Sequence, residues 1–326
     1  MKKIIVSGMR PTGQMHVGHL HGALLNWKSF QDDYRCFYFI ADWHALTTEY
    51  ESPSIIKESK IDMITDWISV GLDPNKCVFF VQSEIKEHAE LHLLFSMIVP
   101  LPWLERNPTY KEQLREISTR DLYTYGFLGY PVLQAADILI YKANGVPVGE
   151  DQAPHVELTR DIARRFNYLY GEVFPLPEVM LTKTSKLLGI DRRKMSKSYN
   201  NAIFLRDEPK VISEKVSQMI TDPQRARKSD PGDPSICNVY SFHEIYTDYQ
   251  KVLEIGESCR TAKIGCVECK KIMAKNLIDS LTPYRERINE LLASKHEVED
   301  ILSEGNNKAR SVARQTMEEV RSRIGL

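Results

Sequence analysis

The sequence of 326 residues has no excess of charge of either sign, because 43 Lys and Arg residues face 44 Asp and Glu residues. This balance excludes a protein that binds polyanions by being basic throughout, so a nucleic acid would have to meet a local basic patch. No apolar run approaches the length of about 18 residues that a membrane span needs. The N-terminal segment MKKIIVSGMRPTG lacks the long apolar core and the cleavage site of a secretory signal. We therefore expect a cytoplasmic protein with no membrane segment, whose six cysteines stay reduced.

What the sequence does contain, in its first half, is an alternation of short apolar runs and longer amphipathic stretches. A hydrophobic fraction of 42% with 27% charged residues excludes a disordered chain. We expect strands at residues 4–6, 36–41, 77–82 and 146–148, and helices at 16–34, 55–70, 84–98 and 156–168. Such alternation, with strands apolar nearly throughout, predicts a parallel sheet covered on both faces. Ligands of these sheets bind beyond the carboxyl ends of the strands.

The chain changes character near residue 206, after which only helical periodicity is evident. The segments concerned are 210–221, 241–256, 268–280, 283–294 and 309–323. We therefore predict an α/β fold with two domains. A Rossmann-like parallel-sheet domain spans residues 1–205, with an insertion at about 84–130, and an all-helical domain spans residues 206–326.

The segment Arg10-Pro-Thr-Gly-Gln-Met-His-Val-Gly-His19 lies between the first strand and the first helix. His16 and His19, three residues apart, share one face of the first helical turn. The free N–H groups and the positive end of the helix dipole make such a terminus attractive to phosphate. Gly18 leaves room for a flat base against the backbone. Histidines that merely fill space at a helix start are the alternative.

A second segment, Lys194-Met-Ser-Lys-Ser198, follows Arg192 and Arg193 in a polar stretch. Two lysines three apart, spaced by small hydroxyl residues, suit a loop that clamps a polyphosphate. Taken alone, the pentapeptide is more typical of a solvated surface loop. Together with the first segment, far upstream in the chain, it becomes a strong indication of nucleotide chemistry.

The two segments together resemble the HIGH and KMSKS signatures of class I aminoacyl-tRNA synthetases. Further matches run in order along the chain and resemble the bacterial tryptophanyl-tRNA synthetases; they are residues 41–48, 134–141, 146–152, 155–160 and 308–313. The resemblance implies that residues 206–326 bind the tRNA anticodon and that the last helix packs back on the catalytic domain. It also implies a homodimer built on the insertion, where the apolar run 93–104 could make the contact. Core packing explains that run nearly as well.

The resemblance further implies a reaction in two steps. Tryptophan and ATP, with Mg²⁺, give tryptophanyl-adenylate and pyrophosphate, and the tryptophanyl group then passes to tRNA(Trp). No protein nucleophile is needed, so catalysis must come from positioning and from neutralising charge. Lys194 and Lys197 would hold the pyrophosphate, and His16, His19 and Thr12 would surround the phosphates and the ribose. The implied ATP contacts are Arg10, Pro11, Thr12, Gly18, His19, Gly149, Glu150, Asp151, Leu187, Lys194, Met195, Ser196, Lys197 and Ser198.

Selection of tryptophan calls for an acceptor aimed at the indole N–H. The residue at the matching position is Asp137, in an apolar stretch, where a helix cap or a surface carboxylate is the alternative. A buried acceptor discriminates strongly, because a substrate without the N–H leaves it unpaired. His44, Tyr130 and Gln152 are implied to complete the pocket.

The six cysteines divide into two groups. Cys36 and Cys77 sit in strand runs and are most simply core residues. The other four, Cys237, Cys259, Cys266 and Cys269, combine a Cys-x-x-Cys pair with two cysteines upstream, which favours a four-thiolate metal site over scattered structural cysteines. Zinc and a [4Fe–4S] cluster both accept four thiolates. A subset of the similar tryptophanyl enzymes has this pattern and carries an iron–sulfur cluster, so the resemblance implies [4Fe–4S], with Zn²⁺ as the alternative.

The same stretch, residues 260–275, holds five basic residues and one acidic residue. A solvated charged face is the ordinary interpretation. Next to a metal site in the appended domain of a tRNA enzyme, we expect contact with the anticodon instead. The residues expected to make it are Arg260, Lys263, Lys270 and Lys271.

Three other functions compete with this one. Tyrosyl-tRNA synthetases share the architecture, and the amino acid that supports ATP–pyrophosphate exchange separates them. Small nucleotidylyltransferases share a HIGH-like turn but have no reason to carry the helical domain. A non-catalytic paralogue acting as an RNA-binding or iron-sensing regulator is disfavoured because both signature loops are intact.

Overall fold

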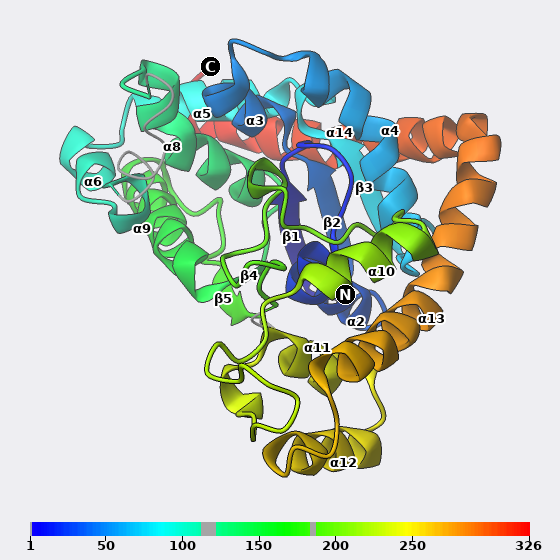
Figure 1. The fold of residues 1–326 in the computed structure, drawn as a ribbon. Coiled ribbons are helices and arrows are strands. Elements are labelled where there is room, and N and C mark those ends of the chain that lie inside the picture. Colours follow the sequence, from blue (N-terminus) through cyan, green and yellow to red (C-terminus); the bar gives the residue numbers. More distant parts are fainter. Residues whose placement is uncertain (1, 112–121, 183–186) are drawn as a thin grey trace. The chain divides into compact units, whose positions relative to one another are not determined.

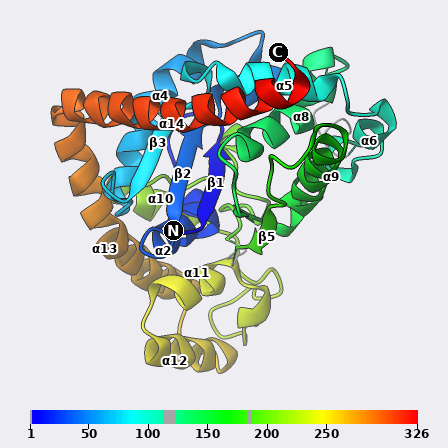
Figure 2. The same cartoon turned by 180° about the vertical axis from the view of Figure 1, so that it is seen from behind.

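The computed structural model describes residues 2–111, 122–182 and 187–326, which form two compact units (Figures 1 and 2). The first unit consists of residues 1–13, 23–184 and 294–326, and the second of residues 14–22 and 185–293. Among the described residues, no helix combines the length and the apolar character needed to cross a bilayer.

A five-stranded parallel sheet forms the centre of the first unit. Its strands, in the order β3-β2-β1-β4-β5, are β3 (Cys77–Val81), β2 (Arg35–Ile40), β1 (Ile4–Met9), β4 (Gly145–Val148) and β5 (Glu178–Leu181). The middle strands are buried on both faces, which is why β2 is a continuous apolar run from Cys36 to Ile40. The predicted Rossmann-like parallel sheet is confirmed, and the strand order reverses between β1 and β4.

Helices cover this sheet and carry the loops at its carboxyl edge. They are α2 (Leu25–Phe30), α3 (Asp42–Glu49), α4 (Ser54–Ser69), α5 (Glu87–Ser96), α6 (Leu101–Glu105), α8 (Tyr125–Leu139), α9 (Ala153–Tyr170) and α14 (Lys295–Ile324). A short helical turn η2 (Gln82–Glu84) follows β3 directly, and η3 (Glu150–Gln152) follows β4 after Gly149. Helix α8 packs against both α5 and α9 (Figure 1).

The last helix, α14, lies against the edge strand β3 (Figures 1 and 2). A Cβ atom on Gly305 would collide with the carbonyl oxygen of Phe79, so only glycine permits this approach. The neighbouring Asn306 accepts a hydrogen bond from the backbone N–H of Val81 at 2.9 Å. The helix thereby satisfies a donor that an edge strand would otherwise expose.

The second unit is built from helices, and its described residues contain no strand beyond isolated bridges. Its elements are α1 (Val17–His19), a wide turn η1 (Leu20–Leu24) that it shares with the first unit, η4 (Lys197–Tyr199), α10 (Pro209–Gln218), η5 (Pro234–Ile236), α11 (Asn238–Tyr246), α12 (Tyr249–Arg260) and α13 (Cys266–Ala293). Helix α13 packs against α10 and α11. The helical character predicted after residue 206 is confirmed, but the unit comprises residues 14–22 and 185–293 rather than the predicted 206–326.

Several helices differ in extent from the predicted ones. The helix predicted at 309–323 begins at Lys295, and the segment predicted as one helix at 16–34 is α1, η1 and α2. Helix α13 is one helix with Pro283 inside it, because buried Leu281 and Ile288 hold it on both sides of the proline. The expected helix 241–256 is two helices, because Thr247 is extended and Asp248 caps α12 by accepting from the N–H of Gln250 at 3.0 Å.

Candidate active site

The candidate site residues of the first unit follow the carboxyl ends of the central strands. Arg10 comes directly after β1, and His44 lies in α3, which begins two residues after β2. Gln82 is the first residue after β3, and Gly149 the first after β4. A parallel sheet of this kind binds its ligands at this edge, so the first unit has its polar groups where a substrate would lie.

The carboxylate of Asp137, on α8, is fully buried. One oxygen, Oδ1, accepts from His88 Nδ1 at 2.6 Å, and Oδ2 accepts from His44 Nε2 at 2.8 Å. The side-chain amide of Gln82 donates to both oxygens, at 2.9 and 2.8 Å. Burial alone would raise the pKa of this carboxyl, but the hydrogen bonds from His44 and His88 outweigh it and hold the pKa below its ordinary value.

A second chain of contacts connects the remaining residues predicted to bind tryptophan. The rings of His44 and Tyr130 meet edge to face, with centroids 6.4 Å apart. The hydroxyl of Tyr130 donates to His155 Nε2 at 2.9 Å, and His155 Nδ1 donates to Gln152 Oε1 at 3.1 Å. Burial lowers the pKa of His155 to about 4, so this imidazole is neutral near pH 7 and can accept the Tyr130 proton. The structure therefore brings Asp137, His44, Tyr130 and Gln152 together.

Near this cluster, Arg10 is an exposed residue at the end of β1. Its guanidinium donates to Thr48 Oγ1 at 3.5 Å. Arginine stays charged at any ordinary pH, so the site holds a fixed cation at this position. The other predicted ATP contacts of this unit are the buried Pro11, the half-buried Thr12 and Gly149, and the exposed Glu150 and Asp151.

The two histidines of the second unit cap the start of α1 and stack on each other, with ring centroids 3.6 Å apart. The Nδ1 atom of His16 accepts from the N–H of His19, and the Nδ1 atom of His19 accepts from the N–H of His16, both at 3.3 Å. Burial, with Lys197 nearby, lowers the pKa of His16 to about 4. The pKa of His19 is lowered by burial and by both His16 and Lys197. Each ring is thus neutral near pH 7 and keeps its proton on Nε2, where it can donate to a ligand.

The second unit also brings the two signature segments together. The N–H of Val17 donates to the carbonyl of Ile203 at 2.9 Å, and the N–H of Leu205 donates to that of Met15 at 3.0 Å. A Cβ atom on Gly18 would lie 3.6 Å from the Cβ of Met195. The predicted Gly18, Met195, His16, His19 and Lys197 therefore form one cluster, although the two segments lie far apart in the sequence.

The loop 194–198 is anchored by one buried side chain, Asn201. Its Oδ1 accepts from the N–H of Ser196 at 2.8 Å, and its Nδ2 donates to the carbonyl of Lys194 at 3.2 Å and to Asp191 Oδ1 at 2.8 Å. Lys194 itself is exposed. The side chain of Ser198 lies outside the described part of the structure, and Leu187 is buried.

Four residues that complete these clusters were missed by sequence reasoning: Gln82, His88, His155 and Asn201. Gln82 carried a signal, because it stands directly after an apolar strand run. His88 and His155 bond to residues on another helix, and Asn201 bonds to a loop that precedes it by 5 to 10 residues. Residue spacing does not reveal such contacts.

The four predicted metal ligands approach one another in the second unit. Burial raises the pKa of the Cys269 thiol to about 12, and the neighbouring Cys237, Cys259 and Cys266 act in the same direction. Within the described ranges, however, no group of three or more His, Cys, Asp or Glu side chains is arranged to hold a metal ion.

A cation, Arg225, lies among these thiols. One nitrogen of its guanidinium, Nη1, contacts the sulfur of Cys259 at 3.7 Å and that of Cys266 at 3.8 Å. Its buried Nε has no hydrogen-bond partner among the described residues. A Cβ atom on Gly232 would lie 2.7 Å from the Cys259 sulfur. The backbone at Gly232, just before η5, therefore approaches that thiol closely.

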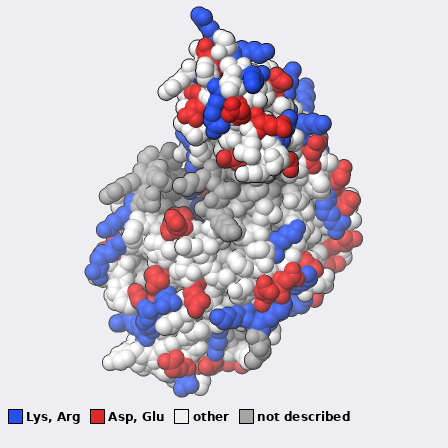
Figure 3. Space-filling view, turned by 90° about the horizontal axis from the view of Figure 1, so that it is seen from below, with Lys and Arg blue, Asp and Glu red and all other residues white. Residues whose placement is uncertain are grey.

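Three of the residues predicted to contact tRNA, Arg260, Lys263 and Lys271, are exposed, and Lys270 donates to the carbonyl of Ser217 at 2.7 Å. On the face shown in Figure 3, basic and acidic side chains are interspersed, in keeping with the balanced total charge.

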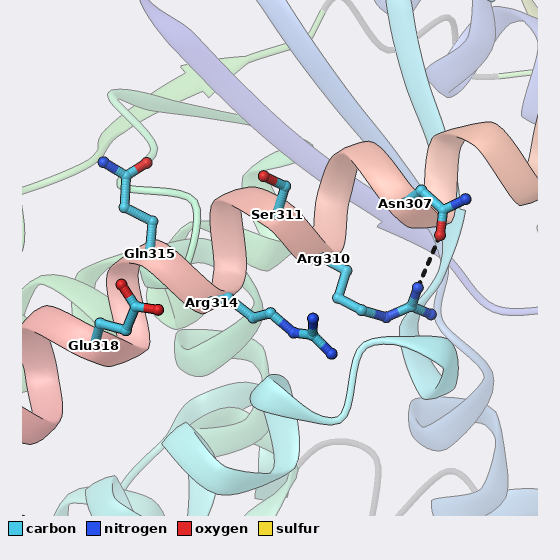
Figure 4. A pocket seen from close by; sticks show the side chains of 6 residues that line it. All are labelled: Asn307, Arg310, Ser311, Arg314, Gln315 and Glu318. Atoms are coloured by element: carbon cyan, nitrogen blue, oxygen red, sulfur yellow. Dashed lines mark hydrogen bonds between the residues drawn. The ribbon is translucent and has the colours of Figure 1, made fainter.

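An open groove runs along α14, and none of the predicted site residues lines it (Figure 4). Arg310 donates to Asn307 Oδ1 and to the carbonyl of Glu84, each at 2.9 Å. Arg314 bonds to the carboxylate of Glu87 at 3.0 Å. The cations of this groove are therefore engaged by the chain itself.

Comparison with known proteins identifies the family. The family model "tRNA synthetases class I (W and Y)" matches residues 2–282. A tryptophan–tRNA ligase of Thermotoga maritima is 55% identical over 324 residues, covering 99% of both chains, and that of Aquifex aeolicus is 47% identical with the same coverage. The crystal structure of tryptophanyl-tRNA synthetase from Campylobacter jejuni, complexed with ADP and tryptophan, matches with a TM-score of 0.89 and 33% identity, covering 99% of this chain and all of the other. The chain belongs to the class I tRNA synthetases, among the bacterial tryptophanyl enzymes.

Proposed function

We propose that the chain activates L-tryptophan with ATP, forming tryptophanyl-AMP and pyrophosphate, and then transfers the tryptophanyl group to tRNA(Trp). In the first step the carboxylate oxygen of tryptophan forms a bond to the α-phosphorus, and the bond from that phosphorus to pyrophosphate breaks. In the second step a ribose hydroxyl of the tRNA attacks the carbonyl carbon, and AMP leaves. The relatives named above support both steps.

The observation that carries the choice of amino acid is the buried carboxylate of Asp137. An ionised carboxylate accepts hydrogen bonds only, and its low pKa keeps it ionised near pH 7. We assign it to the indole N–H of tryptophan, with His44 beside the carboxylate and Tyr130 and Gln152 around the rest of the substrate. A substrate without a donor in that place would leave a buried charge unpaired, which costs far more than a poor fit in an apolar pocket.

The residues proposed for phosphate chemistry differ in charge. Lys194 and Lys197 supply positive charge for the pyrophosphate as it leaves, and His16 and His19 supply neutral Nε2–H donors. Mg²⁺ would enter together with ATP and would neutralise part of the charge on its phosphates. We propose further ATP contacts at the residues implied by the family resemblance, which are Arg10, Pro11, Thr12, Gly18, Gly149, Glu150, Asp151, Leu187, Met195, Ser196 and Ser198.

Amino-acid-dependent ATP–pyrophosphate exchange tests this function directly. We expect exchange with tryptophan and none above background with tyrosine or phenylalanine. Exchange supported by tyrosine instead would assign the chain to the tyrosyl enzymes. Absence of exchange with any amino acid, in protein that still binds ATP, would favour a non-catalytic role.

For Cys237, Cys259, Cys266 and Cys269 we propose a [4Fe–4S] cluster with a structural or RNA-positioning role, since neither step involves oxidation or reduction. The unequal spacing of the four cysteines, with 21, 6 and 2 residues between successive ones, is unlike the paired Cys-x-x-Cys of a zinc ribbon. The family resemblance supports the iron–sulfur assignment.

Anaerobic purification with iron, sulfide and zinc analysis tests this assignment. We expect iron and sulfide with broad visible absorption, both lost in Cys266→Ser and both kept in the control Cys77→Ala, which alters a core cysteine. Zinc in place of iron would support the alternative. If the protein contained neither iron nor zinc, the proposal of a metal site would be refuted.

We also propose that Arg260, Lys263, Lys270 and Lys271 contact the anticodon arm of tRNA(Trp) within residues 206–326. The double variant Lys270→Glu, Lys271→Glu should raise the KM for tRNA and leave adenylate formation unchanged, because phosphate contacts depend on positive charge. The matched control reverses two exposed lysines elsewhere, Lys57 and Lys295. An unchanged KM for tRNA would remove this patch from the RNA site.

A homodimer completes the proposal. Three large apolar side chains are exposed in and between α5 and α6. Leu93 in α5 is 54% exposed, Met97 just after α5 is 69% exposed, and Leu101 in α6 is 60% exposed. Such a density of apolar surface suits an interface. Sedimentation should show a dimer that Met97→Lys weakens. A monomeric wild-type protein would contradict it.

A further inference from the structure

The carboxylate of Asp137 has no vacant acceptor position in this structure. A carboxylate offers about four lone-pair positions. Two contacts reach Oδ1, from His88 and Gln82, and two reach Oδ2, from Gln82 and His44. A substrate that hydrogen-bonds to Asp137 must therefore replace one of these donors.

Only one of the three donors can be replaced by a molecule arriving from solvent. Gln82 and His88 are 0% exposed, as is Asp137. The side chain of His44 is 12% exposed. Gln82 is also committed elsewhere, because its Oε1 accepts from the backbone N–H of Trp43 at 3.1 Å. His44 is thus the exchangeable partner, and Oδ2 is the oxygen that exchange would free.

Tyr141 fixes the orientation of His88 through the ring nitrogen that does not face Asp137. The Tyr141 hydroxyl and His88 Nε2 lie 2.7 Å apart, and both residues are fully buried. A neutral imidazole has a single N–H. If the hydroxyl donates to Nε2, that proton must be on Nδ1, where it points at Asp137. The opposite tautomer would place a nitrogen lone pair against the carboxylate.

We propose that His88, held by Tyr141, is a positioning residue for tryptophan selection, and that His44 occupies the place on Asp137 Oδ2 that the indole N–H takes. This inference rests on the proposed function, because it concerns how that same pocket recognises its substrate. Gln82 and His88 keep the carboxylate in one orientation, and His44 keeps Oδ2 satisfied until tryptophan arrives.

The test uses β-(3-benzothienyl)alanine, in which sulfur replaces the indole N–H with little change of shape. The ratio of kcat/KM for tryptophan over this analogue, measured by pyrophosphate exchange, reports the hydrogen bond to Asp137. We expect a ratio on the order of 10³ or more in the wild-type protein, since the analogue leaves a buried acceptor unpaired. A general loss of structure would lower both rates and leave the ratio unchanged.

The deciding pair of variants is His88→Leu and His88→Asn. Leucine removes the donor, so the ratio should fall at least tenfold, while the amide of asparagine can take the place of Nδ1–H and restore most of it. Tyr141→Phe removes one oxygen and should lower the ratio by a smaller factor than His88→Leu does. If His88→Leu does not fold, Tyr141→Phe tests the positioning role of His88 in its place. An unchanged ratio in both His88→Leu and Tyr141→Phe would overturn the positioning role.

The exchange itself is tested by His44→Phe, which keeps a ring and removes the donor. Because no hydrogen bond has to be broken on entry, we expect the KM for tryptophan to fall severalfold. A higher KM would mean that His44 binds tryptophan directly and does not merely occupy the indole position on Asp137 Oδ2. If the wild-type protein shows no tryptophan-dependent exchange, the proposed function fails; if only the ratios fail to move, that function stands and this inference alone is wrong.

Discussion

The cluster around Asp137 and the loop 194–198 differ in where their polar groups find partners. In the cluster, each side chain that bonds to Asp137 is itself held by packing or by further hydrogen bonds, and Asp137, Gln82 and His88 are fully buried. In the loop, Asn201 binds backbone groups, while Lys194 extends into solvent. The difference matches the two proposed tasks. Selecting one amino-acid side chain requires polar atoms in fixed positions. Binding a polyphosphate that enters, is cleaved and leaves requires charges on flexible side chains.

The strongest way to break this comparison is Asp137→Ala. Removing the fixed acceptor should lower kcat/KM for tryptophan on the order of 10³-fold or more, because selection by a buried hydrogen bond is lost and its donors are left unpaired. Pyrophosphate exchange measures the loss, and ATP binding by calorimetry should persist. Exchange at the wild-type rate would show that the carboxylate does not recognise the substrate.

Lys197→Ala probes the movable side of the comparison. The loss of a cation that acts on the leaving group should lower kcat about 10²- to 10³-fold, with little change in the KM for tryptophan. Single-turnover adenylate formation measures kcat, and Lys210→Ala, at an exposed position of α10, is the control. A rise in the KM for tryptophan with kcat intact would place Lys197 on the amino acid instead.

Asn201→Ala separates the loop's anchor from its charges. Three hydrogen bonds would be lost, with a destabilisation of about 1–3 kcal/mol for the groups left unpaired. We expect kcat to fall about tenfold, less than for Lys197→Ala, because the lysines remain but are held less firmly. Asn200→Gly is the control, since residue 200 has a φ of +50°, which glycine adopts freely. Equal losses in both variants would assign the effect to loop flexibility in general.

The smallest effect concerns neutral histidines beside the two regions, His155 next to the Asp137 cluster and His16 next to Lys197 of the loop. Burial lowers the pKa of His16 and of His155 to about 4, against 6.5 in an unfolded chain. Between these values the unfolded state binds protons that the folded state excludes, so the free energy of unfolding should decrease as pH falls from about 6.5 toward about 4. Thermal unfolding midpoints measured across this range check the direction. His21→Gln should reduce the slope, because burial lowers the pKa of His21 to about 4 as well.

Most of the sheet could be predicted because each of the strands β1 to β4 contains a short apolar run that is largely buried. The fifth strand, β5, could not, because none of its residues is fully buried, unlike those of the other edge strand β3. Glu178 and Leu181 are exposed, and the strand is short. Half-exposed edge strands leave no continuous apolar pattern, so the signal that identified the others was absent.

The candidate site divides in the same way. His16, His19 and the loop 194–198 stand in short segments whose spacing carries meaning, and the resemblance made them identifiable. His88 and Asn201 act through contacts with residues far along the chain or in another turn of the loop, which become visible only when the elements are assembled. Spacing therefore identified the residues that we propose to contact the substrates and missed the residues that hold them in place.

The close approach of Gly305 and Asn306 to β3 has a consequence for how the chain is made. All five strands have been synthesised once translation has passed Leu181, yet the outer edge of β3 stays uncovered until α14, the last helix, follows. During that interval the open edge is a template for pairing with another nascent chain. The final helix covers this edge once it has been synthesised. A chain released before Gly305 is added would keep the edge of β3 open to pairing with other chains.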